Sequence, residues 1–179
     1  MCGRGSYICG KVRLIMLQEF KNLSPAEAQV VYDAIPLITI LVAGADGHMD
    51  EVELAEAERL ANIRGYNNLG HLNAYYEKVS ENLPGRINEL SRELPNDVEP
   101  RQAEIGRRLE ALNAIFPKIQ KPFNYLYYHD LHTFAHHVAE SHGGFLRYMT
   151  IGPKEAKVVD LPMITPVVKP SQVDYPEIY

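Results

Sequence analysis

Residues 36–54 read PLITILVAGADGHMDEVEL, and this stretch decides how the chain folds. From Pro36 to about Ala45 a helix would be apolar on nearly every side, with Thr39 as its polar residue. Such a helix belongs in the centre of a bundle rather than on its surface. Because a proline inside a helical pattern usually breaks the helix, we expect a break near Ile35 and a new helix from Pro36.

Helical signals continue on both sides of this stretch. Ser24-Pro25-Ala26-Glu27 is a capping box with proline at the first helical position, so a helix should begin there. The stretch RGYNNLG at 64–70 predicts a loop. No segment alternates with period two between hairpin turns, so we predict an all-α bundle of about seven helices. The later helices are expected over about 51–63, 72–82, 86–94, 101–116, 122–141 and 153–161.

The length of 179 residues is typical of one domain. We expect an N-terminal extension over 1–22, a helical domain over 23–162 and a proline-rich tail over 163–179. The tail lacks helical periodicity, so we interpret it as an extended arm laid on this chain or on another one.

The charge pattern points to cations rather than to nucleic acid. The net charge of -5 argues against non-specific nucleic-acid binding, which needs a basic face. Residues 46–59 hold six acids against one base, Arg59, so an electrostatic function belongs there.

Cys2 and Cys9 fit no common zinc pattern, and a reducing, cytoplasmic setting is expected. The longest apolar run, 35–45, is about half of the ~20 residues that span a membrane.

A weak internal repeat joins the two halves of the chain. LVAGADGHM at 41–49 aligns with HVAESHGGF at 137–145 through a valine, an alanine and a glycine. This suggests two helical hairpins packed about a pseudo-two-fold axis.

The stretch AGADGHMDEVELAEAERL at 43–60 resembles the first signature of the TerB-like tellurite-resistance domains. ESHGGFLRYMTIGPKEAKVVDLP at 140–162 resembles the second, degenerate copy, so the resemblance covers about residues 24–162.

The resemblance implies an all-helical domain with a cluster of acids that binds a divalent metal. The matched positions are Asp46, Asp50 and Glu53. It also implies a role in metal and oxyanion stress, with protein partners that include membrane proteins and larger complexes, and no assigned enzymatic activity. The histidines of the late helix depart from the family pattern.

The acidic segment supports two interpretations on its own chemistry. It is not an EF-hand, because Gly47 stands second where that loop needs a glycine at the sixth position. Two or three carboxylates suit calcium or magnesium and leave room for waters. In the alternative, Asp46 satisfies a turn, Asp50 caps the next helix and Glu53 complements the helix dipole.

A second candidate site lies on the predicted helix over 122–141. At ~100° per residue, Tyr125, His129, His132 and His136 fall within about 60° of one another. His132 and His136 have the i, i+4 spacing that lets two imidazoles share one metal, and imidazole suits zinc, iron, copper or nickel. The alternatives are a solvated polar face, an interface and proton transfer. The opposite side carries the expected core residues Phe123, Tyr127, Leu131, Phe134 and Val138.

Three functions follow from these patterns. The first is a non-enzymatic, TerB-like domain that binds a divalent metal or regulates a stress response. The second is an interaction subunit of a larger assembly that uses its terminal arms. The third is a metalloenzyme with His132 and His136 as ligands and Asp46 or Glu53 as ligand or base. The tyrosines at 75, 76, 125, 127 and 128 could flank a pocket, but we expect them at core edges, with their hydroxyls reaching the surface.

Overall fold

The chain forms a helical bundle over the residues that the computed structural model describes, namely 18–45, 51–67, 72–140 and 156–178. No strand occurs among these residues, so the predicted all-α class is confirmed. Six of the described α-helices have eight or more residues, one fewer than the approximate seven expected. The expected pseudo-two-fold repeat includes residues 141–145, which lie outside the described ranges.

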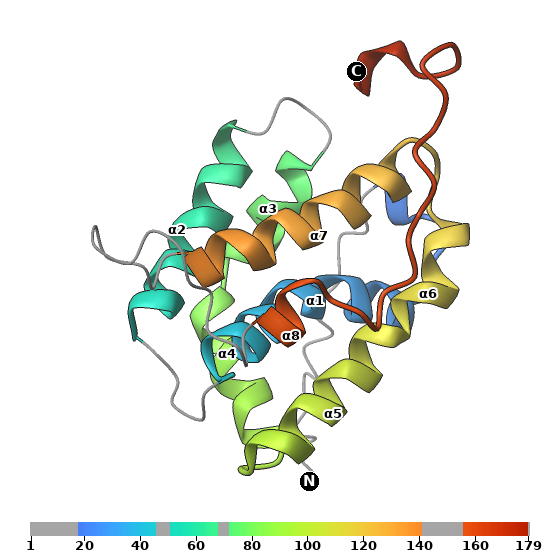
Figure 1. Cartoon of the computed structure of the whole chain (residues 1–179). Coiled ribbons are helices and arrows are strands. Elements are labelled where there is room, and N and C mark those ends of the chain that lie inside the picture. The colour runs from blue at the N-terminus through green and yellow to red at the C-terminus, as the bar shows by residue number, and fades with distance from the viewer. Residues whose placement is uncertain (1–17, 46–50, 68–71, 141–155, 179) are drawn as a thin grey trace, which may run out of the picture.

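The helix α1 occupies the centre of the bundle and packs against α7, α4 and α5 (Figure 1). The helix α2 packs on α3 and on α7. The helix expected over 101–116 is divided, because α5 stops at Glu110 and the short α6 follows it. The long helices are α1 (Pro25–Ala43), α2 (Glu51–Asn67), α3 (Asn73–Ser80), α4 (Leu83–Glu93), α5 (Val98–Glu110) and α7 (Phe123–Glu140). The short elements are α6 (Leu112–Ile115), α8 (Ala156–Val159) and the 3-10 turns η1 (Gln18–Phe20), η2 (Phe116–Lys118) and η3 (Pro176–Ile178).

Helix α1 continues through Pro36, so the expected break near Ile35 is wrong. A proline inside a helix removes one backbone hydrogen bond and costs about 3 kcal/mol. Here the turn before the proline is held by its neighbours. The hydroxyls of Tyr75 and Tyr127 donate to the Val31 carbonyl at 3.0 and 2.9 Å. These contacts and the burial of the helix outweigh the local preference for a break.

The expected burial of the 36–45 stretch is confirmed. Ile38, Ile40 and Leu41 are all at most 1% exposed. Thr39 is also fully buried, and its hydroxyl donates to the Ile35 carbonyl at 2.9 Å. The one polar side chain of the stretch is therefore satisfied within its own helix, as a buried hydroxyl must be.

Helix α1 is also long and apolar enough to cross a membrane, judged by length and composition alone. The apolar run over 35–45 is too short to span a membrane, but the helix that contains most of it begins at Pro25 rather than at Pro36 and is therefore longer. In the bundle, 78% of its most apolar window is buried against the rest of the protein. Its position at the centre of the core accounts for this composition.

A cluster of aromatic rings fills the space between α1, α3 and α7. Tyr75, Tyr76 and Tyr127 are fully buried, so the expectation that their hydroxyls reach the surface is wrong. Phe20 of η1 packs edge-on against Tyr75 and Phe123 at centroid distances of 6.1 and 5.3 Å. Burial raises the pKa of all three tyrosines well above the ordinary value.

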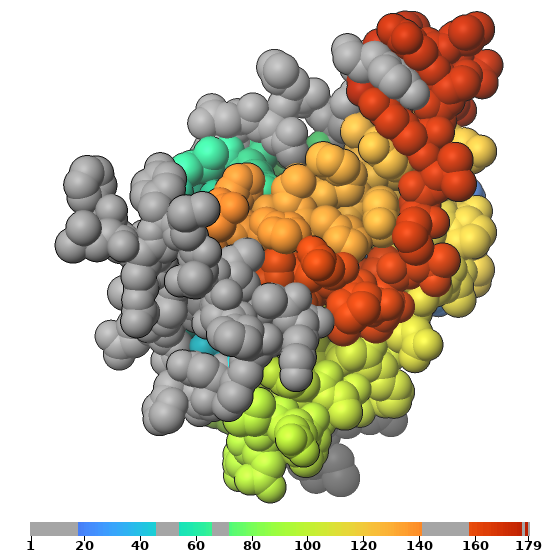
Figure 2. Space-filling model, viewed as in Figure 1, coloured from blue at the N-terminus to red at the C-terminus, as the bar shows by residue number. Residues whose placement is uncertain are grey.

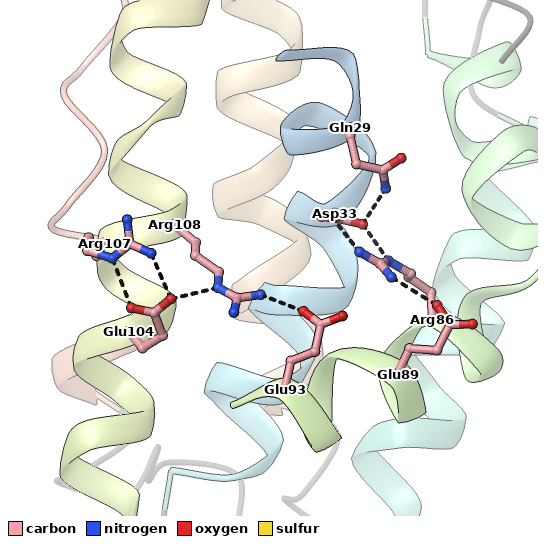
Figure 3. A network of polar contacts seen from close by, with 8 residues as sticks. All are labelled: Gln29, Asp33, Arg86, Glu89, Glu93, Glu104, Arg107 and Arg108. Atoms are coloured by element: carbon pink, nitrogen blue, oxygen red, sulfur yellow. Dashed lines mark hydrogen bonds and ion pairs between the residues drawn. The ribbon is translucent and has the colours of Figure 1, made fainter. Parts of the chain in front are cut away.

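Two ion-pair groups on the surface connect α1, α4 and α5 (Figure 3). Arg86 of α4 donates to both carboxylate oxygens of Asp33 on α1 at 2.7 and 2.8 Å. Arg108 of α5 donates to Glu93 on α4 at 3.1 Å and to Glu104 on its own helix at 2.8 Å. The two-point contact between Arg86 and Asp33 fixes geometry as well as charge, so it orients α4 on α1.

The C-terminal tail follows the body of the bundle and then projects beyond it (Figures 1 and 2). The Asn113 amide fixes the start of the tail, because it donates to the Met163 carbonyl at 3.0 Å and accepts from the Thr165 amide at 2.8 Å. Farther along, Val168 and Val173 are 85% and 91% exposed. Between 162 and 178 the only helical element is η3, which agrees with the expected extended arm.

Candidate functional site

The acidic segment between α1 and α2 is described only at its two flanks. Asp46 and Asp50 lie outside the described residues, and Glu53 lies in the first turn of α2 with its side chain outside them. The metal-binding and structural interpretations of these three acids therefore both remain predictions. The structure shows how α1 and α2, the helices on either side of the segment, are held in the bundle.

The entrance to the acidic segment is fastened to α5. Arg101 donates to the Gly44 carbonyl at 3.0 Å, and Gln102 donates to the Ala45 carbonyl at 3.5 Å. These carbonyls follow the end of α1, where backbone acceptors lack partners within the helix. A Cβ atom at position 44 would lie 2.8 Å from the Ile40 carbonyl oxygen and 3.2 Å from the Arg101 guanidinium. Glycine is therefore required here for space.

The predicted histidine face of α7 is confirmed in its geometry. The core residues of this helix are all buried, as expected from the helical spacing. On the other side, Tyr125, His132 and His136 are partly exposed and His129 is exposed. Aromatic rings contact one another along this face, with Tyr128 and His132 tilted by 58° at a centroid distance of 4.6 Å. The face is thus aromatic and only partly solvated.

His136 contacts a carboxylate from a distant part of the chain. Its Nε2 atom lies 3.1 Å from Oδ1 of Asp160, which directly follows α8. This confirms the expectation that His132 or His136 contacts a carboxylate, a metal or a partner chain. Asp160 was not among the predicted residues, because its separation of 24 residues from His136 gives no periodic signal.

His132 occupies a half-buried position one turn before His136. Its Nε2 atom is buried and has no hydrogen-bond partner among the described residues. Burial lowers the pKa of the His132 imidazole, and the neighbouring His136 lowers it further, while Asp160 opposes the shift. These shifts favour the neutral form of the ring, whose buried Nε2 atom lacks a hydrogen bond among the described residues.

The described part of the chain contains no group of three or more His, Cys, Asp or Glu side chains that could hold a metal ion. The proposed combination of His132 and His136 with Asp46 or Glu53 also reaches beyond the described residues. The metalloenzyme interpretation therefore stays a prediction.

A partly buried polar network that the sequence did not predict joins α2, α3 and α7. Arg64 donates to the Asp130 carboxylate at 2.6 Å and to the Tyr76 hydroxyl at 3.1 Å. Tyr76 donates to the other oxygen of the same carboxylate. The second Arg64 nitrogen lies 3.1 Å from Nδ1 of His137. The sequence predicts that a loop begins at Arg64. Instead, α2 extends to Asn67, so Arg64 is helical.

The electrostatics of this network favour the charged form of the Arg64 guanidinium. Burial alone would lower the pKa of the Arg64 guanidinium, but Tyr76 and Asp130 more than offset this, and the pKa is raised. The guanidinium also lies over the rings of Tyr76 and Phe134, at 5.5 Å from each centroid. Sequence reasoning missed the network because Arg64 and Asp130 are 66 residues apart.

No protein-family model matches this sequence, and no curated protein or solved structure matches it either. The resemblance to TerB-like domains therefore depends on the residues quoted from the sequence, above all 43–60.

Proposed function

We propose that the chain is a TerB-like helical domain, without enzymatic activity, that binds a divalent cation between α1 and α2. Asp46, Asp50 and Glu53 would supply the ligands. Carboxylate oxygens favour hard cations such as calcium and magnesium, which keep waters in their remaining positions. The resemblance further suggests a role in metal or oxyanion stress, in the cytoplasm or beside a membrane complex.

The observation that carries the proposal is that the acidic segment connects two helices that are both anchored in the bundle. Arg101 and Gln102 hold its entrance, and the helix that follows it, α2, is anchored near its C-terminal end by the Arg64–Asp130 contact. Only residues 46–50 separate two anchored parts of the core. A cation bound there would join α1 to α2, so its binding energy would add to the stability of the fold.

The test is the effect of calcium or magnesium on thermal unfolding. We expect each effective cation to raise the melting temperature of the natural chain by mass action. The substitution Asp46→Asn should abolish this increase and leave the metal-free melting temperature nearly unchanged. Glu58→Gln is the matched control, because it removes one negative charge from an exposed position of α2. The absence of any cation-dependent shift in the natural chain would refute the proposal.

Asp50 allows the structural alternative to be separated from the cation site. If Asp50 acts only as a helix cap, Asp50→Ala should cost about 1 kcal/mol with or without the cation. If it is a ligand, most of the loss should appear only when the cation is present.

The exposed tail favours a second candidate function, namely docking on a protein partner. Val168 and Val173 are almost fully exposed on a segment whose start is fixed to the body by Asn113. Exposed apolar side chains on a projecting segment are suited to a partner with an apolar groove.

Photocrosslinking in cells tests this interaction. A crosslinking residue placed at 168 should give one discrete product, whose yield falls when Val173→Ser is added. A crosslinker at Ala103, on the exposed part of α5, is the control. Equal labelling from positions 168 and 103 would argue against docking through the tail.

A further inference from the structure

The chain makes a strained turn where α8 ends and the C-terminal tail begins. Leu161 has a φ of 44°, which lies in the left-handed region that bulky side chains rarely adopt. It is followed by Pro162, and a residue before a proline prefers an extended conformation. We propose that this turn is a hinge, and that the tail after it, residues 162–178, is exchanged between two copies of the chain. This goes beyond the cation site and does not depend on Val168 or Val173.

The tail is held by contacts that a second copy can supply in the same form. The Asn113 side chain on α6 donates to the Met163 carbonyl at 3.0 Å and accepts from the Thr165 amide at 2.8 Å. Because this side chain pairs with backbone groups, it binds the segment whichever copy the segment belongs to. Ile164 is only 3% exposed, and the terminal carbon of Met163 lies 3.7 Å from where a Cβ at Gly106 of α5 would stand.

The hinge turn is closed by backbone hydrogen bonds and by burial. The Leu161 amide donates to the Val158 carbonyl at 3.0 Å, and the Ile164 amide donates to the Leu161 carbonyl at 2.9 Å. The Leu161 side chain is fully buried, which holds its unfavourable backbone conformation in the closed chain. Opening the turn gives up the bond between Ile164 and Leu161, and it releases the left-handed conformation. A short hinge under strain favours exchange of the segment that follows it.

The protein concentration decides between the closed chain and the exchanged dimer. The contacts that Asn113 makes with the tail are the same in both forms, so they do not favour either one. The dimer relieves two strained turns, but it loses the independent motion of one chain. The tail follows the outside of the bundle and then projects beyond it, so it can move to a second copy while the helices stay folded (Figures 1 and 2).

The experiment asks whether the tail contacts its own chain or another one. Full-length chains with a photocrosslinking residue at position 163 are prepared with ordinary and with heavy nitrogen, and are refolded together at several concentrations. Light should link position 163 to the part of α5 around Gly106, and mass spectrometry shows whether the two linked peptides have the same isotope. We expect pairs of mixed isotope, whose share rises with concentration together with a dimer in sedimentation velocity.

Pro162→Ala tests the hinge itself, because Pro162 is exposed and its removal frees Leu161 from the restriction before a proline. The association constant of the dimer should fall about fourfold or more, since two hinges open in each dimer. Pro166→Ala is the matched control, because Pro166 is also exposed but lies beyond the contact with Asn113, and it should leave the constant unchanged. The proposal is overturned if position 163 gives no mixed pairs at any concentration, even when a dimer forms. Equal weakening of the dimer by the two proline substitutions would overturn the hinge.

Discussion

A single residue with several partners holds the start of α1. This residue is Glu27, which completes the capping box of α1 and also pairs with Lys118 of η2. Its carboxylate accepts from the Ser24 amide at 2.9 Å and from the Ser24 hydroxyl at 3.0 Å. One side chain thereby caps a helix and ties it to an element about ninety residues later.

The contacts of Glu27 make a testable contribution to acid stability. The hydrogen bond from Lys118 and those from Ser24 lower the pKa of Glu27 from 4.5 to about 2. A carboxylate with a lowered folded-state pKa stabilises the protein above the unfolded pKa, and this contribution is lost as the pH falls. Between about pH 4.5 and about pH 2, the free energy of unfolding should therefore fall more steeply in the natural protein than in Glu27→Gln.

Denaturant unfolding at a series of pH values measures this difference. Glu110→Gln is a suitable control, because Glu110 is exposed and has no ion pair among the described residues. Parallel pH profiles for the natural protein and Glu27→Gln would contradict the assignment.

At the scale of elements, the contact between α2 and α7 combines apolar packing with an ion pair that is mostly shielded from solvent. The side chains of Arg64 and Asp130 are only 12% and 14% exposed. Both have further partners, since Tyr76 binds the pair from α3. Removing one member of a buried pair leaves an uncompensated charge, which costs more than removing both.

Asp130→Ala should therefore lower the free energy of unfolding by about 3 to 5 kcal/mol. In an Arg64→Met background the same change should cost clearly less, because no buried guanidinium is left without a partner. A double-mutant cycle by chemical denaturation measures the coupling. Arg59→Ala, which breaks the exposed pair with Glu56 on the same helix, should change stability by no more than about 0.5 kcal/mol. Additive effects of the Arg64 and Asp130 substitutions would rule out the coupling.

At the scale of the whole molecule, sequence patterns correctly predicted the features that depend on interactions between residues close together in the sequence. The capping box at Ser24, the burial of the 36–45 stretch and the core residues of α7 all follow from spacing and polarity. The break at Pro36 failed because the rule considers a helix alone. The tyrosine hydroxyls that support this turn come from positions 44 and 96 residues away from Val31.

The candidate sites divide in the same way. Helical periodicity placed His132 and His136 on one face, but it could not supply Asp160, which reaches His136 only through the tertiary fold. Arg64 was assigned to a loop because the glycine and asparagines after it are typical of turns. In the fold Arg64 is helical and contacts Tyr76 and Asp130, which lie 12 and 66 residues away in the sequence. Asp46 and Asp50 remain predictions from the sequence.

The buried aromatic cluster gives this protein a built-in optical reporter. The chain has eleven tyrosines and no tryptophan, so its near-ultraviolet absorption comes mainly from phenol rings. Tyr75, Tyr76 and Tyr127 hold their protons in the folded state, whereas phenols of the unfolded chain ionise near the ordinary pKa of 10.0. Phenolate absorbs at longer wavelength than phenol, so a spectrum recorded in mild alkali separates the rings of the core from those in solvent. Alkali also favours unfolding, because only the unfolded chain releases these protons.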